Sequence, residues 1–160
     1  MLSLDWIAGF FDGEGSASVR IANNKTCKYG FQVLPEITIG QKTRPIIEAI
    51  RDRLGFGHVY RMGGGWQFVL HSRIDIGRFV LLMRKRSVLK KRQLVLLART
   101  MRHLERDATS AGARFRGACL SKGTMRELLL IAREMRTLNR KRHRHTVDLS
   151  RLEIKLKSPL

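Results

Sequence analysis

The stretch that organises this chain is Ile7-Ala8-Gly9-Phe10-Phe11-Asp12-Gly13-Glu14-Gly15. It forms most of a helix predicted over residues 4–13, in which apolar residues recur over nearly three turns and then stop at glycines. Because apolar residues surround this helix almost completely, we expect it to be buried. Gly9 and Gly13 are four positions apart and share one helix face. Their missing side chains would let a second helix approach closely, although glycines here could also only kink or cap the helix.

Immediately after this helix the pattern changes to an alternation of apolar and polar residues. The alternation from Ser16 to Ala22 predicts a strand, and a second strand is expected over about 30–41 after a polar turn. Pro35 interrupts the second strand, because proline has no N–H to donate. It therefore predicts a bulge or an edge position.

The rest of the chain is predicted to contain one more β-hairpin and several helices. Thr43 is expected to cap a helix over 45–54, with proline in its first turn. Strands at about 57–62 and 66–71 are joined through glycines 63–65. Further helices are predicted at 74–83, 88–107, 124–139 and 147–156.

This order of elements predicts an α+β fold, with a four-stranded antiparallel sheet, helices on one face and extra C-terminal helices. We expect one domain over residues 1–160, with a core of about 4–110 and a basic helical extension of about 120–160. The other sheet face would be polar, and the alternation places on it Ser18, Arg20, Gln32, Thr38, Tyr60, Gln67 and His71.

The charge of the chain indicates its kind of partner. There are 32 Lys and Arg but only 13 Asp and Glu, a net charge of +19. So few acids cannot pair with so many bases, which argues against a mere surface ion-pair network and for a nucleic-acid binder. No apolar run is long enough for a membrane span, and no signal-peptide pattern opens the chain. With two cysteines in no metal motif, an intracellular, reducing location is expected.

The motif at residues 7–15 resembles the signature of the LAGLIDADG homing endonucleases. Similar matches occur at residues 41–43, 55–59 and 88–93, so the resemblance covers most of 4–110. A single copy of the motif is typical of the homodimeric branch. The resemblance implies two motif helices packed at a dimer interface formed by Ile7, Gly9, Phe10 and Gly13. It also implies cleavage of both strands of a long pseudo-palindromic DNA site with 3′ overhangs, by an intron-encoded protein that promotes the mobility of its intron. We expect it in the cytoplasm or nucleoid of a prokaryote, or in an organelle.

The resemblance further implies a metal-dependent active site. Glu14 and the carbonyl of Gly13 would bind Mg²⁺, which Mn²⁺ or Ca²⁺ could replace, since carboxylate oxygens suit such hard cations. Gln41 would orient the attacking water, and Lys90 would stabilise charge near the scissile phosphate. Glu14 could otherwise be a surface carboxylate, Gln41 a helix-entry residue and Lys90 an ordinary DNA contact. Asp12 is expected to be structural, accepting hydrogen bonds from backbone near the helix end.

Double-stranded DNA and a second copy of the chain are the expected partners, with no membrane and no small-molecule substrate. The polar sheet face would lie in the major groove, where Arg20 favours guanine and Gln67 adenine. Phosphate contacts are expected from Arg84, Arg86, Lys91, Arg140, Lys141 and Arg142. An intron RNA maturase or a catalytically silent DNA-binding regulator on the same fold are the alternatives. Because Pro45 stands where some relatives carry an arginine, the role of Arg44 is left open.

Overall fold

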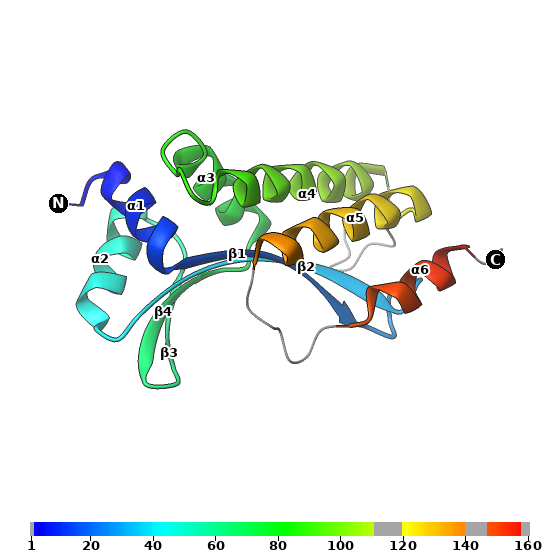
Figure 1. The fold of residues 1–160 in the computed structure, drawn as a ribbon, viewed down its shortest axis with the longest axis horizontal. Coiled ribbons are helices and arrows are strands. Elements are labelled where there is room, and N and C mark those ends of the chain that lie inside the picture. The colour runs from blue at the N-terminus through cyan, green and yellow to red at the C-terminus, as the bar shows by residue number, and fades with distance from the viewer. Residues whose placement is uncertain (1, 111–119, 140–146, 158–160) are drawn as a thin grey trace. The chain divides into compact units, whose positions relative to one another are not determined.

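The computed structural model describes residues 2–110, 120–139 and 147–157 (Figure 1). The elements are α1 (Leu4–Glu14), β1 (Gly15–Asn23), β2 (Phe31–Gln41), α2 (Arg44–Leu54), β3 (His58–Met62), β4 (Gly65–Leu70), α3 (Arg73–Met83), α4 (Lys91–Ser110), α5 (Lys122–Leu138) and α6 (Leu149–Lys157). Every predicted helix and strand within the described ranges is present, so the α+β prediction is confirmed. No helix in these ranges is both long and apolar enough to cross a membrane.

The four strands form one sheet in the order β1-β2-β4-β3. β4 pairs antiparallel with β2 from Ile37↔Leu70 to Gln41↔Trp66, and with β3 from His58↔Val69 to Met62↔Gly65. In β1 and β2 burial alternates along the strand, as the sequence pattern predicted.

The prediction of a bulge or an edge position at Pro35 is decided by this topology. Burial alternates through Pro35 without a break, which argues against the bulge. β2 is an inner strand, but its pairing with β4 ends at Ile37. Pro35 lies beyond that point, at an edge of the sheet on the β4 side, so its missing N–H removes no hydrogen bond to β4.

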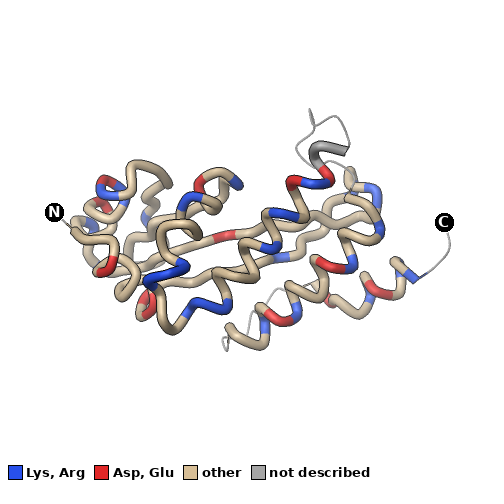
Figure 2. The backbone as a smooth tube through the Cα atoms, turned by 90° about the horizontal axis from the view of Figure 1, so that it is seen from above, with Lys and Arg blue, Asp and Glu red and all other residues tan. Residues whose placement is uncertain are grey.

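The chain divides into two compact units. Unit 1 contains Met1–Ser18 and Pro35–Ala98, and unit 2 contains Val19–Leu34 and Arg99–Leu160. Lys and Arg outnumber Asp and Glu along the described backbone, as Figure 2 shows.

The core of unit 1 is built around α1. Phe11 is fully buried, and its ring meets that of Phe79 on α3 edge to face, with 5.1 Å between ring centroids. Gly15 ends the helix where a Cβ would lie 2.1 Å from the Phe11 ring, so the turn into β1 requires glycine. The fully buried residues of β2 and β4, Ile37, Ile39 and Phe68, continue this core.

In unit 2 an aspartate of one helix fixes the start of the next. The buried carboxylate of Asp107 on α4 accepts hydrogen bonds from the Ser121 N–H (2.7 Å) and the Thr124 hydroxyl (3.1 Å) at the beginning of α5. Arg133 of α5 and Glu153 of α6 form an ion pair at 2.8 Å. Two helices joined through residues 140–146, which lie outside the described ranges, are thus held together by side chains.

Two helix starts differ from the sequence-based prediction. Thr43 does occupy the N-cap position of α2, but its side chain makes no capping hydrogen bond, so the predicted reason for the cap is wrong. α4 begins at Lys91 and not at residue 88. The backbone N–H groups of Val88, Leu89 and Lys90 donate to the carboxylate of Asp12, and this side chain from α1 takes the place of an extra helical turn.

Candidate active site and nucleic-acid interface

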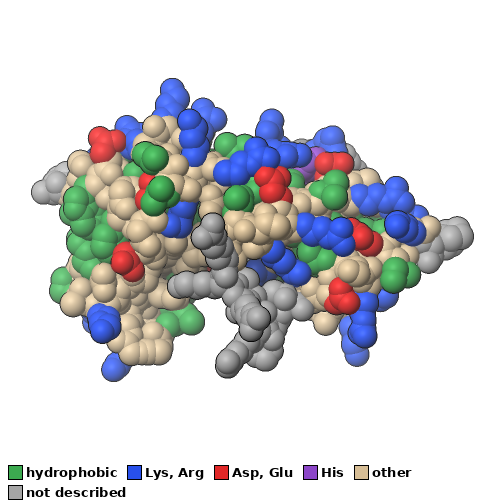
Figure 3. All heavy atoms as spheres, viewed as in Figure 1, with side chains coloured by type: hydrophobic (Ala, Val, Ile, Leu, Met, Phe, Trp, Pro, Cys, Tyr) green, Lys and Arg blue, Asp and Glu red, His purple; other side chains and the backbone are tan. Residues whose placement is uncertain are grey.

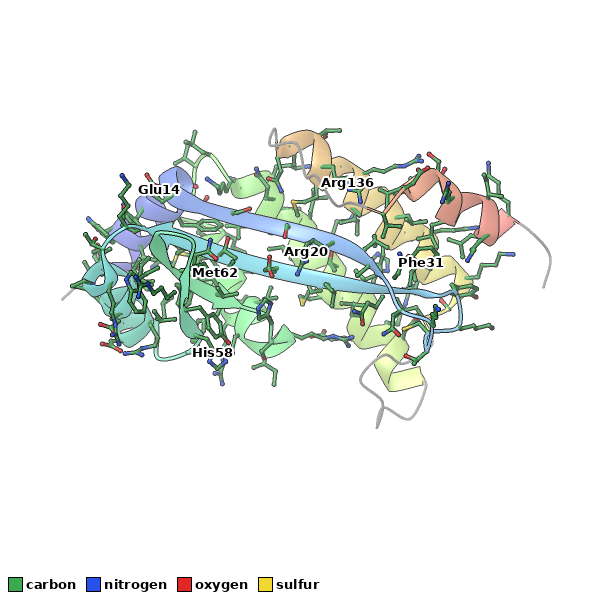
Figure 4. The ribbon with its side chains drawn as sticks, turned by 90° about the horizontal axis from the view of Figure 1, so that it is seen from below. Glu14, Arg20, Phe31, His58, Met62 and Arg136 are labelled. Atoms are coloured by element: carbon green, nitrogen blue, oxygen red, sulfur yellow. The ribbon has the colours of Figure 1, made fainter. Side chains whose placement is uncertain are left out.

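Glu14 is the last residue of α1 and lies where that helix joins β1 (Figure 4). Its side chain is exposed. Gly13 and Gly15 flank it, and Gly13 is also exposed with open space around its Cα. Because the two residues beside Glu14 have no side chains, its carboxylate is accessible to a ligand.

Asp12 has the structural role that was predicted, although its partners belong to a distant segment. Its carboxylate accepts hydrogen bonds from the Ser87 hydroxyl (2.5 Å) and from backbone N–H groups of Val88 (2.7 Å), Leu89 (3.1 Å) and Lys90 (3.1 Å). Burial raises the pKa of Asp12, but these hydrogen bonds outweigh it and hold the pKa below its ordinary value. Asp12 thus caps α4 and is already saturated with donors.

Lys90 lies against the end of α1. Its ammonium donates a hydrogen bond to the backbone carbonyl of Asp12 and lies 5.6 Å from the centre of the Phe11 ring. Burial lowers the pKa of Lys90, while the charges of Asp12 and Glu14 act in the opposite direction. The structure therefore brings Lys90 and Glu14, which are distant in sequence, within electrostatic reach of each other.

Gln41 lies at the same end of the β1–β2 hairpin as Glu14. The two strands are neighbours joined by a short connection and so run antiparallel, which places the start of β1 beside the end of β2. The Gln41 side-chain oxygen accepts a hydrogen bond from the Lys42 N–H (2.7 Å). This hydrogen bond just before α2 agrees with the alternative that Gln41 is a helix-entry residue. To orient a water molecule, the Gln41 amide would have to rotate away from Lys42.

Arg44 is a neighbour of Gln41 whose role the sequence left open. Its guanidinium lies 4.6 Å from the centre of the Trp66 ring, and Trp66 faces Gln41 in the β2–β4 register. The Arg44 Nε also donates to Glu48 at 2.8 Å. A cation is thereby held in a fixed orientation at this end of the sheet.

One stripe of α1 faces outward. Trp6, Gly9, Phe10 and Gly13 follow helical spacing, and the rings of Trp6 and Phe10 stack at 4.9 Å. Trp6 is 40% exposed, and a Cβ on either glycine would meet no atom within 4 Å. Ile7 is wrong as an interface residue, because its side chain is fully buried in the core of unit 1.

Two exposed apolar residues also lie beside the end of α1. Val88 and Leu89 are 79% and 73% exposed, and their N–H groups are bonded to Asp12 of α1. Sequence reasoning assigned 88–107 to a helix and so missed them. Trp6 was missed too, although its four-residue spacing from Phe10 was a signal.

The polar face of the sheet is confirmed where the register is known. Thr38, Gln67 and Tyr60 belong to one face, because Tyr60 and Gly40 both lie opposite Gln67. The same alternation adds His58 and Met62 of β3, which the sequence analysis did not name and which are both exposed (Figure 4). Ser18 is half-buried and Arg20 exposed on the outward positions of β1.

Several of the predicted DNA contacts already have partners within the chain. Gln32 accepts a hydrogen bond from Asn24 (3.0 Å), and His71 lies 3.3 Å from the carboxylate of Glu36. Arg86 pairs with Asp5 at 3.1 Å and donates to the Leu82 carbonyl. Arg84 and Lys91 are exposed. Arg140, Lys141 and Arg142 lie outside the described residues.

The described part of the chain contains no group of three His, Cys, Asp or Glu side chains that could hold a metal ion. Asp12 is occupied by its four donors. The donors a chain could offer at this end of α1 are the Glu14 carboxylate and nearby backbone oxygens. Oxygen donors suit Mg²⁺, which keeps several waters and completes its coordination with substrate phosphates.

Comparison with known proteins identifies relatives of this arrangement. The LAGLIDADG endonuclease family model matches residues 7–95. The DNA endonuclease I-CreI of Chlamydomonas reinhardtii is 27% identical over 101 residues, which are 62% of this chain and 62% of that protein. The chain therefore spans less than two thirds of that curated relative.

Solved structures resemble the whole fold. The homing endonuclease I-TnaI superposes with a TM-score of 0.72 at 28% identity, covering 98% of this chain and 97% of its own. The archaeal intron-encoded homing endonuclease I-Vdi141I, solved in complex with DNA, gives a TM-score of 0.81 at 23% identity, with 96% and 93% covered.

Proposed function

Since this chain belongs to the LAGLIDADG endonuclease family, we propose that it is a site-specific DNA endonuclease acting as a homodimer. It would bind a long, pseudo-palindromic site and hydrolyse both strands with Mg²⁺, leaving 3′ overhangs. A role in the mobility of the intron that encodes it follows from the same proposal. The polar sheet face and a net charge of +19 support DNA as the substrate.

The observation that carries this proposal is that two nearby acidic residues, Asp12 and Glu14, have different surroundings. Asp12 is saturated by hydrogen bonds from the start of α4, whereas Glu14 is exposed beside Lys90. This end of α1 offers one exposed carboxylate per chain, so a second copy placed by two-fold symmetry would add its own Glu14 and serve the second DNA strand. The outward stripe of α1, with two glycines and two stacked rings, suits close packing against its own copy.

Each group then has a chemical role. Glu14 and the Gly13 carbonyl would hold Mg²⁺, and the bound ion would activate water and neutralise phosphate charge. Gln41, once turned away from Lys42, would orient the water. The Lys90 ammonium would stabilise the negative charge that develops on the phosphate. Water adds across one P–O bond, so one strand end keeps the phosphate and the other gains a hydroxyl.

The test is cleavage of a randomised duplex-DNA library by the wild-type chain and Glu14→Gln, with Mg²⁺ or with EDTA. We expect Mg²⁺-dependent cuts at one enriched, near-palindromic sequence, which disappear in Glu14→Gln. Glu153→Gln on α6 removes the same charge and should cut like the wild type. Mn²⁺ and Ca²⁺ are tested in the same assay.

The other outcomes contradict the proposal in distinct ways. Selective binding without cutting by the wild type would identify a silent DNA-binding regulator. Absence of both binding and cutting would favour the maturase alternative. Cleavage by a species that sediments as a monomer on DNA would contradict the homodimer.

A further inference from the structure

A pocket of about 350 Å³ lies on α4 in unit 2. Its described lining is entirely basic and consists of Arg99, Arg102, His103 and Arg106. Figure 3 shows Lys and Arg side chains gathered over α4. The proposed cleavage reaction uses none of these four side chains.

The four side chains share one face of α4 because their spacing follows the helical repeat. The opposite face of the same turns carries Thr100, Met101 and Leu104, which are buried. The basic residues were therefore not placed by the need to fill a core. Like charges three and four positions apart disfavour a helix, so a bound anion would be favourable at this face.

We propose that this basic face of α4 binds the phosphodiester backbone of a nucleic acid, as a contact additional to the polar sheet face. Arginine guanidinium groups donate two parallel hydrogen bonds to a phosphate, and the His103 ring can donate a further one. Three arginines converge on one pocket, which is the composition expected for phosphate recognition and not for an apolar ligand.

The dimensions of the face fit a strand and not an isolated phosphate. Arg99 and Arg106 are two turns apart, a separation of about 10 Å along the helix axis. One strand of duplex DNA carries a phosphate for about every 3.4 Å of the duplex axis, so this face is long enough to reach more than one phosphate. The backbone could belong to flanking DNA of the cleavage target or to RNA, since both present the same phosphodiester chemistry.

The experiment measures how binding depends on salt, because each phosphate contact releases counterions. The test variant is Arg99→Gln/Arg102→Gln/Arg106→Gln. The matched control, Arg73→Gln/Arg151→Gln/Lys157→Gln, removes the same charge from exposed positions elsewhere. The probes are a labelled oligouridine RNA and a labelled duplex of random sequence, in EDTA over a range of KCl concentrations.

We expect the slope of log K against log salt to become shallower in the test variant by about 2 for the RNA or about 2.7 for the duplex, with little change in the control. A change for the RNA alone identifies RNA as the ligand, and a change for the duplex alone identifies flanking DNA. Equal slopes in test variant, control and wild type for both probes would overturn the proposal. Equal decreases of the slope in the test variant and in the control would also overturn the proposal.

Folding of the variant is checked by circular dichroism. Arg102→Gln alone, at an exposed position, serves if the triple variant does not fold, with an expected slope change of about 0.7 for RNA. Because Glu14, Gln41 and Lys90 are untouched, the rate of DNA cleavage at saturating protein should persist in all these variants, even where a variant weakens binding of the DNA. Loss of the α4 contact and failure of the endonuclease proposal are therefore distinguishable.

Discussion

Asp12 and Lys90 are joined by two hydrogen bonds that run in the same direction. The backbone N–H of Lys90 donates to the Asp12 carboxylate over 3.1 Å, and the Lys90 ammonium donates to the Asp12 carbonyl. Asp12 thereby caps α4 through its carboxylate and holds the Lys90 ammonium through its backbone carbonyl. The stability of the fold and the geometry of the proposed active site therefore depend on the same residue.

Replacing Asp12 by alanine should destabilise the chain by about 2 kcal/mol, because the start of α4 loses its cap and the donors of residues 87–90 lose their acceptor. Urea unfolding at neutral pH measures this. Asp52→Ala is the control, since Asp52 is exposed and pairs with its neighbour Arg51, so its loss should change stability by no more than about 0.5 kcal/mol.

The difference in unfolding free energy between the wild type and Asp12→Ala should depend on pH. The folded chain holds the pKa of Asp12 below its ordinary value of 3.8, so folding favours the ionised carboxylate. Its contribution is complete above pH 3.8 and is lost as the pH falls through the lower folded pKa. The gap in unfolding free energy between wild type and Asp12→Ala should stay constant from neutral pH downward and shrink only under acidic conditions. A gap unchanged at acidic pH would contradict this account.

Lys90→Met should reduce the rate of DNA cleavage about 10²- to 10³-fold at saturating protein, because a positioned cation beside Glu14 is lost. Binding should change little. The exposed neighbour Lys91 gives the control: Lys91→Met should weaken binding and reduce the salt slope by about 0.9, with the saturated rate intact. Equal effects of the two variants on rate would remove Lys90 from the proposed site.

Gly9→Leu should separate dimerisation from folding. A Cβ at this position would lie in open space, and leucine favours the helix more than glycine does. We expect a folded protein that sediments as a monomer and does not cut DNA. Gly123→Leu on α5 places the same side chain at another exposed helical glycine and should leave the dimer intact. A dimeric Gly9→Leu protein would exclude the α1 stripe as the interface.

Arg20→Ala should relax base preference at one position of each half-site, at a cost of about 1–3 kcal/mol for the preferred base. Arg20 is exposed on an outward position of β1. Selection from a library of partly randomised target sites measures the preference. An unchanged preference at every position would count against readout by this sheet face.

Much of the fold was predictable because its signals are local. The glycine-bounded helix at residues 4–13 and the alternation after Ser16 reflect residues a few positions apart, and both elements form as expected. The motif also placed Glu14 at the end of α1, with an exposed side chain. The polar sheet face followed from alternation alone, although His58 and Met62 were overlooked.

Tertiary packing decided what local patterns could not. Whether Ile7 faces a partner or the core depends on what packs against α1, and the structure buries it. The predicted start of α4 was wrong because the cap of this helix comes from Asp12, more than seventy residues earlier in the chain. The sequence by itself determined the elements, the charge and the family motif, since these depend on neighbouring residues. Only the tertiary structure decided which acid is saturated and which is exposed, because hydrogen-bond partners distant in sequence are set by packing.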